Sequence, residues 1–172
     1  YGMSECFNPI TVLEPPEVAV VMAEAESGLG ACLGWPAPGV EIETRGEDGA
    51  RLAAGETGEI FLRARHMNAG TIGPAGFVPR AAGAWHRTGD LGAVDDRGRL
   101  HLSGRAADVM KSGGYRVHPG EIESALDGVA GGRAVCVLGL PSADGGEVIG
   151  GVAEAPGEGG AVEGQARVAA LA

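Results

Sequence analysis

Glycine and proline make up about a quarter of this chain, and their spacing constrains the fold more than any other feature. The 172 residues include 32 Gly and 10 Pro, which approaches the level at which low-complexity disorder is expected. The glycines do not form tracts, however, but separate short segments in which apolar and polar residues alternate. This spacing is typical of tight turns between short strands. Because aromatic residues are only 4% of the chain, we expect a core of Val, Leu, Ile and Ala.

The charge and the cysteines argue against several kinds of partner. With 13 Lys and Arg against 23 Asp and Glu, the net charge is −10, and such a surface repels phosphate backbones and anionic lipids. Apolar runs such as residues 18–23 are far shorter than the roughly 20 residues of a membrane span. Cys6, Cys32 and Cys136 are odd in number and form no CxxC pair, which fits neither a disulfide framework nor a zinc site. We therefore expect a cytoplasmic protein that binds no nucleic acid and does not insert into membranes.

The alternating segments between residues 27 and 103 predict a small β-rich unit. Turn-forming runs separate them, and Gly98 is placed for a positive φ. Residues 66–84 are rich in Gly, Ala and Pro and are expected to form a loop, while residues 1–26 show no clear period. Five or six short strands indicate a curled or distorted barrel-like sheet. The expected strands are 40–44, 59–63, 91–94 and 100–102, with turns at 46–49, 55–58 and 95–98.

After Arg105 the pattern becomes that of a compact α+β unit. Pro119 and Glu121 favour the start of a helix, because proline fits the first turn and a carboxylate suits the positive end of the helix dipole. Gly128, together with Gly131 and Gly132, is expected to end the helix. Its apolar stripe is Ile122, Ala125, Leu126 and Val129. The remaining expected elements are strands at 134–140 and 147–153 and a helix at 161–172. The fold class is therefore α+β, with a division near residues 103–108.

Three segments far apart in the chain carry the chemistry. The first is Tyr1-Gly2-Met3-Ser4-Glu5, the second is Trp85-His86-Arg87-Thr88-Gly89-Asp90-Leu91, and the third runs from Gly104 to Glu123. In order and residue type they resemble motifs of the adenylate-forming superfamily, which includes acyl-CoA synthetases, luciferases and the adenylation domains of peptide synthetases. The resemblance implies that residues 1–104 are the C-terminal part of the large AMP-binding domain. Residues 105–172 are then an incomplete C-terminal domain.

The first two segments suit a nucleotide. Asp90 offers two acceptor oxygens that match the vicinal hydroxyls of ribose. An isolated aspartate in a Thr-Gly-Asp bend more often caps the turn, but the resemblance assigns the ribose role. Tyr1, beside Gly2, could stack on adenine or only pack at a strand end, and Ser4 can donate to a phosphate or carboxylate. Glu5 suits Mg²⁺, which is usually held by one or two carboxylates and the substrate phosphates, although a solvated surface acid is the simpler interpretation.

The third segment supplies the cations that adenylation needs, because negative charge develops at the phosphorus. The resemblance places Arg105 at the junction between domains, bonded to ribose or phosphate, and gives Arg116 a nucleotide contact in one domain orientation. Lys111 corresponds to a lysine that reaches the active site during thioester formation. The loop that follows resembles one beside the pantetheine arm of CoA, where a backbone without Cβ atoms can approach a narrow ligand, although a plain turn would explain the glycines too. Its residues are Gly113, Gly114 and Tyr115.

Other basic side chains are expected to be structural. An isolated arginine is usually a surface residue whose stem covers apolar surface, and we expect this of Arg97 and Arg99. No metal-ligand spacing links the four histidines, which are His66, His86, His101 and His118.

The three motifs together predict part of an AMP-forming acyl-CoA synthetase, which joins a carboxylic acid to ATP and passes the acyl group to CoA. The family's phosphate loop would precede Tyr1 and a catalytic lysine would follow Ala172. The chain alone is therefore expected to be inactive and to need the N-terminal part of the same enzyme. The expected ligands are ATP or AMP, Mg²⁺ and CoA. Two alternatives stay open, an adenylation domain that loads a carrier protein and a catalytically silent interaction module, but the run from Lys111 to Tyr115 resembles the CoA ligases better.

Overall fold

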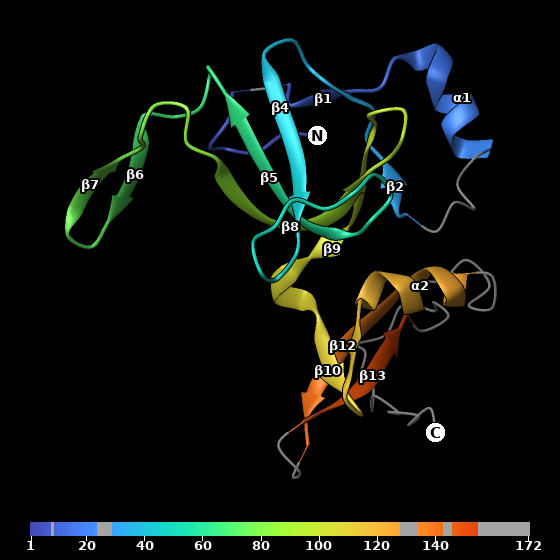
Figure 1. Cartoon of the computed structure of the whole chain (residues 1–172). Coiled ribbons are helices and arrows are strands. Elements are labelled where there is room, and N and C mark those ends of the chain that lie inside the picture. The colour runs from blue at the N-terminus through green and yellow to red at the C-terminus, as the bar shows by residue number, and fades with distance from the viewer. Residues whose placement is uncertain (8, 24–28, 128–133, 143–145, 155–172) are drawn as a thin grey trace, which may run out of the picture. The chain divides into compact units, whose positions relative to one another are not determined.

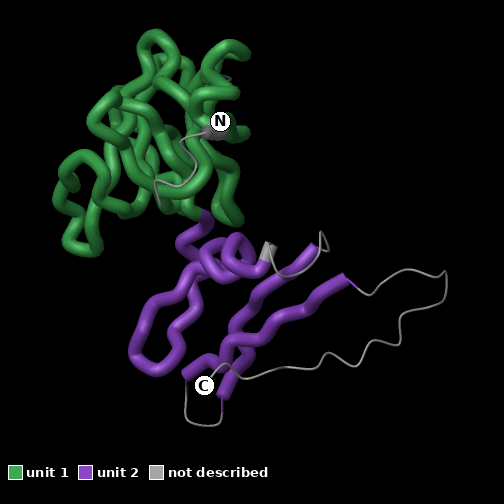
Figure 2. Tube along the Cα trace, turned by 90° about the vertical axis from the view of Figure 1, so that its right-hand side faces the viewer, with its two compact units in different colours: residues 1–103 green, residues 104–172 purple. Residues whose placement is uncertain are grey.

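The computed structural model describes residues 1–7, 9–23, 29–127, 134–142 and 146–154. It divides into two compact units, Tyr1–Ser103 and Gly104–Ala172 (Figure 2). Unit 1 is mostly β-strand, and the described part of unit 2 combines helix and strand. The α+β class expected from the sequence is therefore confirmed. No helix in the described ranges is long and apolar enough to cross a bilayer.

A five-stranded sheet forms the centre of unit 1, in the order β2-β9-β8-β5-β4 (Figure 1). β4 pairs antiparallel with β5, and β5 pairs antiparallel with β8. The order has two ends, so the sheet formed by the described strands stays open and does not close into a barrel. The strands are β2 (Ala31–Cys32), β4 (Val40–Arg45), β5 (Gly58–Ala64), β8 (His86–Val94) and β9 (Leu100–Arg105).

The four strands expected for this unit are confirmed as β4, β5, β8 and β9. β8 begins earlier than expected, at His86, so it contains the bend at Thr88-Gly89-Asp90. Gly89 and Gly98 both have a positive φ, of 77° and 79°. A glycine adopts this conformation without the steric cost that a Cβ would add, which explains why each stands where the chain bends.

Alternation along β5 gives the sheet a buried face. Ile60 and Leu62 are fully buried. Leu62 packs with Val40 and with Cys6 and Ile10 from the N-terminal segment. Burying an aliphatic side chain of this size contributes about 1.5–3 kcal/mol. The first motif segment is therefore anchored to the sheet by the apolar packing of Cys6 and Ile10, which follow it, and of its own Tyr1 and Met3.

The opposite face of β4 and β5 carries arginines stacked on aromatic rings. The Arg45 guanidinium lies 4.3 Å from the centroid of the Phe61 ring and 5.5 Å from that of Trp85. Arg63 lies 4.7 Å from the Trp85 centroid. Both arginines also form ion pairs with glutamates of β4. Cation–π contacts contribute about 0.5–1 kcal/mol each at exposed sites, so these side chains stabilise one another on the polar face.

The expectation of a plain loop over residues 66–84 is wrong. β6 (Gly70–Gly73) and β7 (Gly76–Pro79) pair antiparallel and form a hairpin that extends away from the five-stranded sheet (Figure 1). The high content of Gly, Ala and Pro masked the β-forming residues on both sides of the turn. Ile72 and Phe77, which belong to these strands, are exposed.

The N-terminal residues, for which the sequence shows no clear period, also form regular structure. β1 (Thr11–Val12) pairs antiparallel with β3 (Trp35–Pro36), and α1 (Pro15–Ala23) follows β1. Val18 and Val20 of α1 are exposed. Over residues 15–21, where the structure describes the side chains, no residue of the helix is buried, so this part shows no buried apolar stripe of the kind by which helices are recognised in a sequence.

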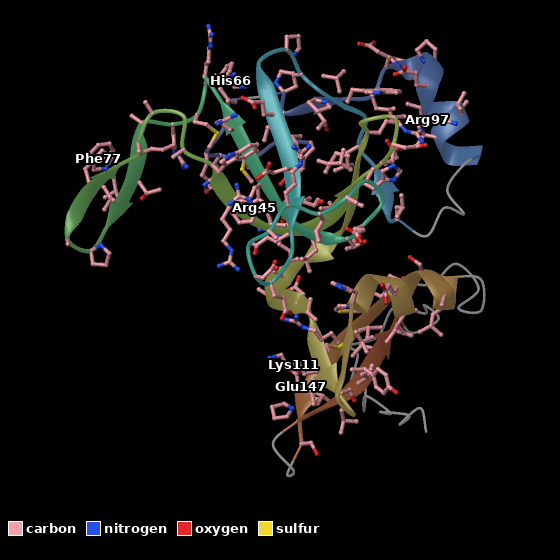
Figure 3. The ribbon with its side chains drawn as sticks, viewed as in Figure 1. Arg45, His66, Phe77, Arg97, Lys111 and Glu147 are labelled. Carbon is pink, nitrogen blue, oxygen red and sulfur yellow. The ribbon has the colours of Figure 1, made fainter. Side chains whose placement is uncertain are left out.

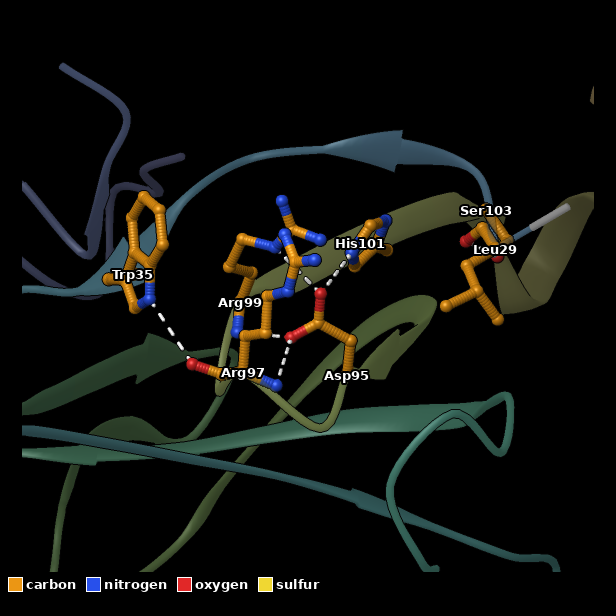
Figure 4. A network of polar contacts seen from close by, with 7 residues as sticks. All are labelled: Leu29, Trp35, Asp95, Arg97, Arg99, His101 and Ser103. Carbon is orange, nitrogen blue, oxygen red and sulfur yellow. Dashed lines mark hydrogen bonds and ion pairs between the residues drawn. The ribbon is translucent and has the colours of Figure 1, made fainter. Parts of the chain in front are cut away.

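The turn between β8 and β9 is held by a buried ionic network around Asp95 (Figure 4). Asp95 Oδ1 accepts hydrogen bonds from the backbone N–H groups of Arg97 and Arg99, at 3.0 and 2.8 Å. Asp95 Oδ2 accepts from Arg99 Nε at 2.7 Å and lies 3.0 Å from His101 Nε2. The Trp35 indole N–H donates to the Arg97 carbonyl at 3.2 Å. Arg99 is 8% exposed, so the expectation of a surface position is wrong for Arg99, whereas Arg97 is exposed.

Because of this network, unit 1 should lose stability in acid. Burial alone would raise the pKa of Asp95, but the hydrogen bonds from Arg99 and His101 outweigh it and lower that pKa from 3.8 to about 2. Because the folded-state pKa is depressed, the stabilisation is complete above the unfolded-state pKa and is lost as pH falls through the folded-state value. We expect about 2 kcal/mol of unfolding free energy to disappear between about pH 5 and pH 2, measured by urea titration. If Asp95→Asn, which lacks the titrating group, loses as much over this range, the assignment is contradicted.

Two antiparallel strand pairs and one α-helix make up the described part of unit 2. β10 (Met110–Ser112) pairs with β11 (Tyr115–Val117), and β12 (Val135–Pro141) pairs with β13 (Glu147–Ala153). A short 3₁₀ helix, Ala106–Asp108, precedes β10.

The helix α2 (Pro119–Asp127) begins at the predicted proline. Val137 in β12 donates its N–H to Glu123 Oε1 at 2.8 Å, which ties the helix to that strand. Ala125 is exposed, so the apolar stripe is narrower than expected. The strands expected at 134–140 and 147–153 are confirmed as β12 and β13. Val129 and the helix expected at 161–172 lie outside the described residues.

Candidate functional site

The first motif segment lies along the chain that leads into β6. The Asn68 N–H donates to the Glu5 carbonyl at 2.7 Å, and the Phe7 N–H donates to the His66 carbonyl at 3.2 Å. Cys6, which lies between Glu5 and Phe7 in the chain, is 1% exposed. Burial raises the pKa of the Cys6 thiol, and the nearby Arg80 only partly offsets this. Cys6 is therefore a neutral packing group that anchors the motif backbone.

The second motif places Asp90 in the sheet of unit 1. The Thr88 hydroxyl donates to the Ile60 carbonyl at 2.8 Å, and the Asp90 N–H donates to the Thr88 Oγ1 at 3.0 Å. With Gly89 at positive φ between them, these bonds hold a bend within β8. The Asp90 side chain is only 4% exposed, so its position is set by the strand and not by solvent.

The structure brings Tyr1 and Asp90 into contact. The Tyr1 hydroxyl donates a hydrogen bond to Asp90 Oδ2. The Tyr1 carbonyl in turn accepts from the Ile10 N–H at 3.1 Å, which holds the tyrosine against β1. Gly2 and Ser4, the other residues expected at this site, are exposed. The first motif thus brings an aromatic ring to the buried carboxylate of the second, and both lie in unit 1.

A second polar cluster lies beside Glu5. Arg80 donates from Nε and Nη2 to Asn68 Oδ1 at 3.2 and 3.0 Å. Arg80 Nη1 lies 3.1 Å from His86 Nδ1. Burial lowers the pKa of His86, Arg80 lowers it further, and Glu5 raises it. A neutral His86 accepts at Nδ1, so the guanidinium is fixed by two neutral acceptors. Sequence reasoning missed Arg80, because no motif contains it.

In unit 2, the residues expected to serve the acceptor step lie on the hairpin β10–β11. Lys111 is opposite Arg116, and Ser112 is opposite Tyr115. Gly113 and Gly114 form the two-residue turn with φ of 57° and 84°, a combination that suits a type I′ turn. All of the expected residues of this hairpin are exposed, namely Lys111, Gly113, Gly114, Tyr115 and Arg116. Lys111 is also the only lysine of the sequence.

Glu147 supports this hairpin from the neighbouring strand. The Lys111 N–H donates to Glu147 Oε2 at 2.6 Å, and Figure 3 shows the two residues at the same end of unit 2. A Cβ added to Gly139 would lie 2.8 Å from the Glu147 carboxyl carbon, so the glycine makes room for that carboxylate. No sequence signal pairs residues so far apart, and Glu147 was not anticipated.

Arg105 ends β9 and is exposed. It belongs to unit 2, whereas Tyr1, Ser4, Glu5 and Asp90 belong to unit 1. The residues expected to bind the nucleotide are therefore divided between the two units, because Arg105 and Arg116 belong to unit 2, whereas those expected to serve the acceptor step all belong to unit 2.

The described residues contain no cluster of three or more His, Cys, Asp or Glu side chains that could hold a metal ion. Glu5 is a single carboxylate. Mg²⁺ needs only one or two carboxylates when substrate phosphates supply further ligands. The single carboxylate of Glu5 therefore fits a magnesium ion that binds together with a nucleotide, and it fits a preformed metal site less well.

The comparisons with known proteins agree with these motifs. Feruloyl-CoA synthase of Amycolatopsis sp is 30% identical over 172 residues, which cover 99% of this chain and 33% of that protein. The 2-succinylbenzoate–CoA ligase of Enterococcus faecalis is 28% identical over 148 residues, or 86% of this chain and 29% of that protein. The chain belongs to the adenylate-forming superfamily. It spans about a third of the length of these relatives, and no protein-family model matches it.

Solved structures of the superfamily share the fold. The o-succinylbenzoate CoA synthetase of Bacillus subtilis, in complex with its acyl-adenylate intermediate, is 27% identical with a TM-score of 0.68, covering 92% of this chain and 31% of that one. The amide bond synthetase McbA of Marinactinospora thermotolerans is 30% identical with a TM-score of 0.70, covering 89% and 30%. ATP-bound MatB of Rhodopseudomonas palustris is 32% identical with a TM-score of 0.60, covering 71% and 25%.

Proposed function

We propose that this chain supplies the nucleotide-binding strand and the acyl-transfer hairpin of an AMP-forming acyl-CoA synthetase in the cytoplasm. One observation carries the proposal: Tyr1 of the first motif donates its hydroxyl hydrogen to the carboxylate of Asp90 in the second. Two motif residues far apart in sequence thus meet where an aromatic ring and a carboxylate can hold a nucleoside. Similar proteins solved with ATP or an acyl-adenylate support this assignment.

In this proposal the residues of unit 1 bind the nucleotide. Asp90 accepts hydrogen bonds from the ribose hydroxyls, and the Tyr1 ring lies against adenine. Because the Tyr1 hydroxyl already bonds Asp90 Oδ2, it shares or yields that oxygen when ribose binds. Ser4 donates to the α-phosphate or to the acid. Glu5 ligates Mg²⁺ carried by the phosphates.

The proposed reaction has two steps. A carboxylate oxygen of the acid attacks the α-phosphorus of ATP, the bond from that phosphorus to pyrophosphate breaks, and acyl-AMP forms. The CoA sulfur then attacks the acyl carbonyl, the bond to the AMP oxygen breaks, and the thiol proton passes to solvent. Arg105 and Arg116 stabilise charge on the phosphate oxygens, and Lys111 serves the second step.

The exposed turn of the β10–β11 hairpin favours CoA as the acceptor. A Cβ at Gly113 or Gly114 would meet no atom within 4 Å, so the backbone is open to a narrow ligand such as a pantetheine chain. Both CoA and carrier proteins present this group, and an amide bond synthetase has a similar structure. An experiment must therefore distinguish CoA from a carrier protein as the acceptor of the acyl group.

The test places this chain in feruloyl-CoA synthase in exchange for the segment that it matches, so that the parts before and after it are both present, and measures the half-reactions separately. We expect Lys111→Ala to spare ATP–pyrophosphate exchange and to slow acyl transfer to CoA about 10-fold to 100-fold, the value of one charge-assisted hydrogen bond. Ser124→Ala, at an exposed position of α2, is the control and leaves both steps unchanged. Acyl transfer to a pantetheinylated carrier protein but not to CoA would select the alternative acceptor. Absence of exchange in the joined protein would contradict the proposed function.

A further inference from the structure

Arg80 is a fixed cation that forms no ion pair with a described carboxylate. Its guanidinium is held by Asn68 Oδ1 and by His86 Nδ1, and both are neutral acceptors. Among the described residues, no carboxylate lies within ion-pair distance of Arg80. Most arginines of this acidic chain that are held in place by side chains pair with Asp or Glu, as Arg45, Arg63 and Arg87 do. Arg80 is therefore positioned but not neutralised.

The contacts that hold Arg80 do not use all the hydrogen-bond donors of its guanidinium. A guanidinium carries five N–H donors, and the contacts to Asn68 and His86 use three of them. The side chain is half-buried, so its position is restricted but part of it remains accessible to a ligand. A pre-positioned arginine with two remaining donors suits an oxyanion, which can accept both.

The position of Arg80 relates it to the proposed nucleotide site. Its partner Asn68 is bonded through the backbone to Glu5, and its partner His86 stands on the same strand as Asp90. Four residues of a strand span about 13 Å. With the ribose at Asp90, a phosphate chain that follows β8 towards His86 approaches Glu5 and Arg80.

We propose that Arg80 binds the phosphate chain of the nucleotide beyond the α-phosphate, that is, the part that ATP has and AMP lacks. This inference rests on the proposed function. It assigns to the hairpin segment after β7 a ligand-binding residue that lies outside all three motifs. Asn68 and His86 are then positioning residues, because they orient the guanidinium and do not themselves touch the ligand.

The test measures binding of AMP and of magnesium-ATP to the 172-residue chain by calorimetry. We expect Arg80→Gln to weaken ATP binding at least about tenfold, the effect of one lost charge-assisted contact, and to leave AMP binding unchanged. Arg80→Lys keeps the positive charge but loses the planar arrangement of N–H donors that a guanidinium presents, so this variant should retain part of the ATP affinity. Arg65→Gln is the matched control, because it removes the same charge from an exposed position of unit 1. Thermal unfolding of each variant verifies folding.

Several outcomes would overturn the inference. Equal weakening of ATP binding by Arg80→Gln and Arg65→Gln would mean that the loss comes from the change in net charge and not from a contact of Arg80 with the phosphates. Equal weakening of AMP and ATP by Arg80→Gln would make Arg80 a structural residue. Loss of acetate binding in this variant with ATP binding intact would identify a carboxylate as the ligand. If the original chain binds ATP but Arg80→Gln changes nothing, only this inference fails, whereas a chain that binds neither nucleotide contradicts the proposed nucleotide site itself.

Discussion

Asp90→Ala should lower the affinity of the chain for AMP by about 10²-fold to 10⁴-fold. The substitution removes a carboxylate that would accept two hydrogen bonds from ribose, each worth about 1.5–3 kcal/mol when the acceptor is charged. Calorimetric titration of AMP measures the loss. Asp96→Ala is the matched control, because Asp96 is an exposed aspartate in the next turn and its loss changes the net charge equally.

Tyr1→Phe separates ribose binding from local structure. This variant keeps the ring but removes the hydroxyl that donates to Asp90. If the Asp90 carboxylate acts on the ribose, Tyr1→Phe should change AMP affinity far less than Asp90→Ala does. An equal loss in both variants would mean that the Tyr1–Asp90 bond only holds the first motif in place. The turn-capping interpretation of Asp90 would then be the better one.

Asp95→Ala should destabilise unit 1 by about 3–5 kcal/mol, because it breaks a buried ion pair by removing the carboxylate that binds the Arg99 guanidinium. The loss is large against the roughly 5–15 kcal/mol that stabilises a typical domain. Urea unfolding near neutral pH measures it. The neighbouring Asp96→Ala, which removes an exposed carboxylate, should change the unfolding free energy by less than about 0.5 kcal/mol.

A loss below about 1 kcal/mol in Asp95→Ala would contradict this account. The Asp95–Arg99 pair would then contribute no more than an ion pair on the surface. The acid titration of the original chain provides an independent measure of the same carboxylate, because it changes the charge of Asp95 without removing the side chain.

The strands of unit 1 could be predicted because their cause is local. Alternation of Val40, Ile42 and Thr44 with glutamates, and the glycine-bearing turn before Arg99, specify strand and hairpin without knowledge of distant residues. The hairpin β6–β7 and the helix α1 could not be found this way. Ile72 and Phe77 of the hairpin and Val18 and Val20 of the helix are exposed, so these segments do not show the apolar period that a buried face produces in a sequence.

The candidate site divides in the same manner. The expected residues could be proposed from the sequence because they stand in contiguous motifs, and the contact between Tyr1 and Asp90 is consistent with the shared ligand those motifs imply. Arg80 and Glu147 stand in no motif. Each becomes a candidate only through a partner distant in sequence, His86 or Asn68 for Arg80 and the Lys111 backbone for Glu147.

The sequence by itself determined the superfamily, the α+β class, the main strands and the residue types available for nucleotide chemistry, because these follow from local alternation, turn chemistry and contiguous motifs. Only the tertiary structure decided which charges are neutralised. Arg99 is buried against Asp95, while Arg80 is held by Asn68 and His86 and forms no ion pair within the described part of the chain. In the sequence the two arginines look alike. The difference arises because the energy of a charge depends on its burial and on the groups within a few ångströms of it, and folding alone brings those groups together.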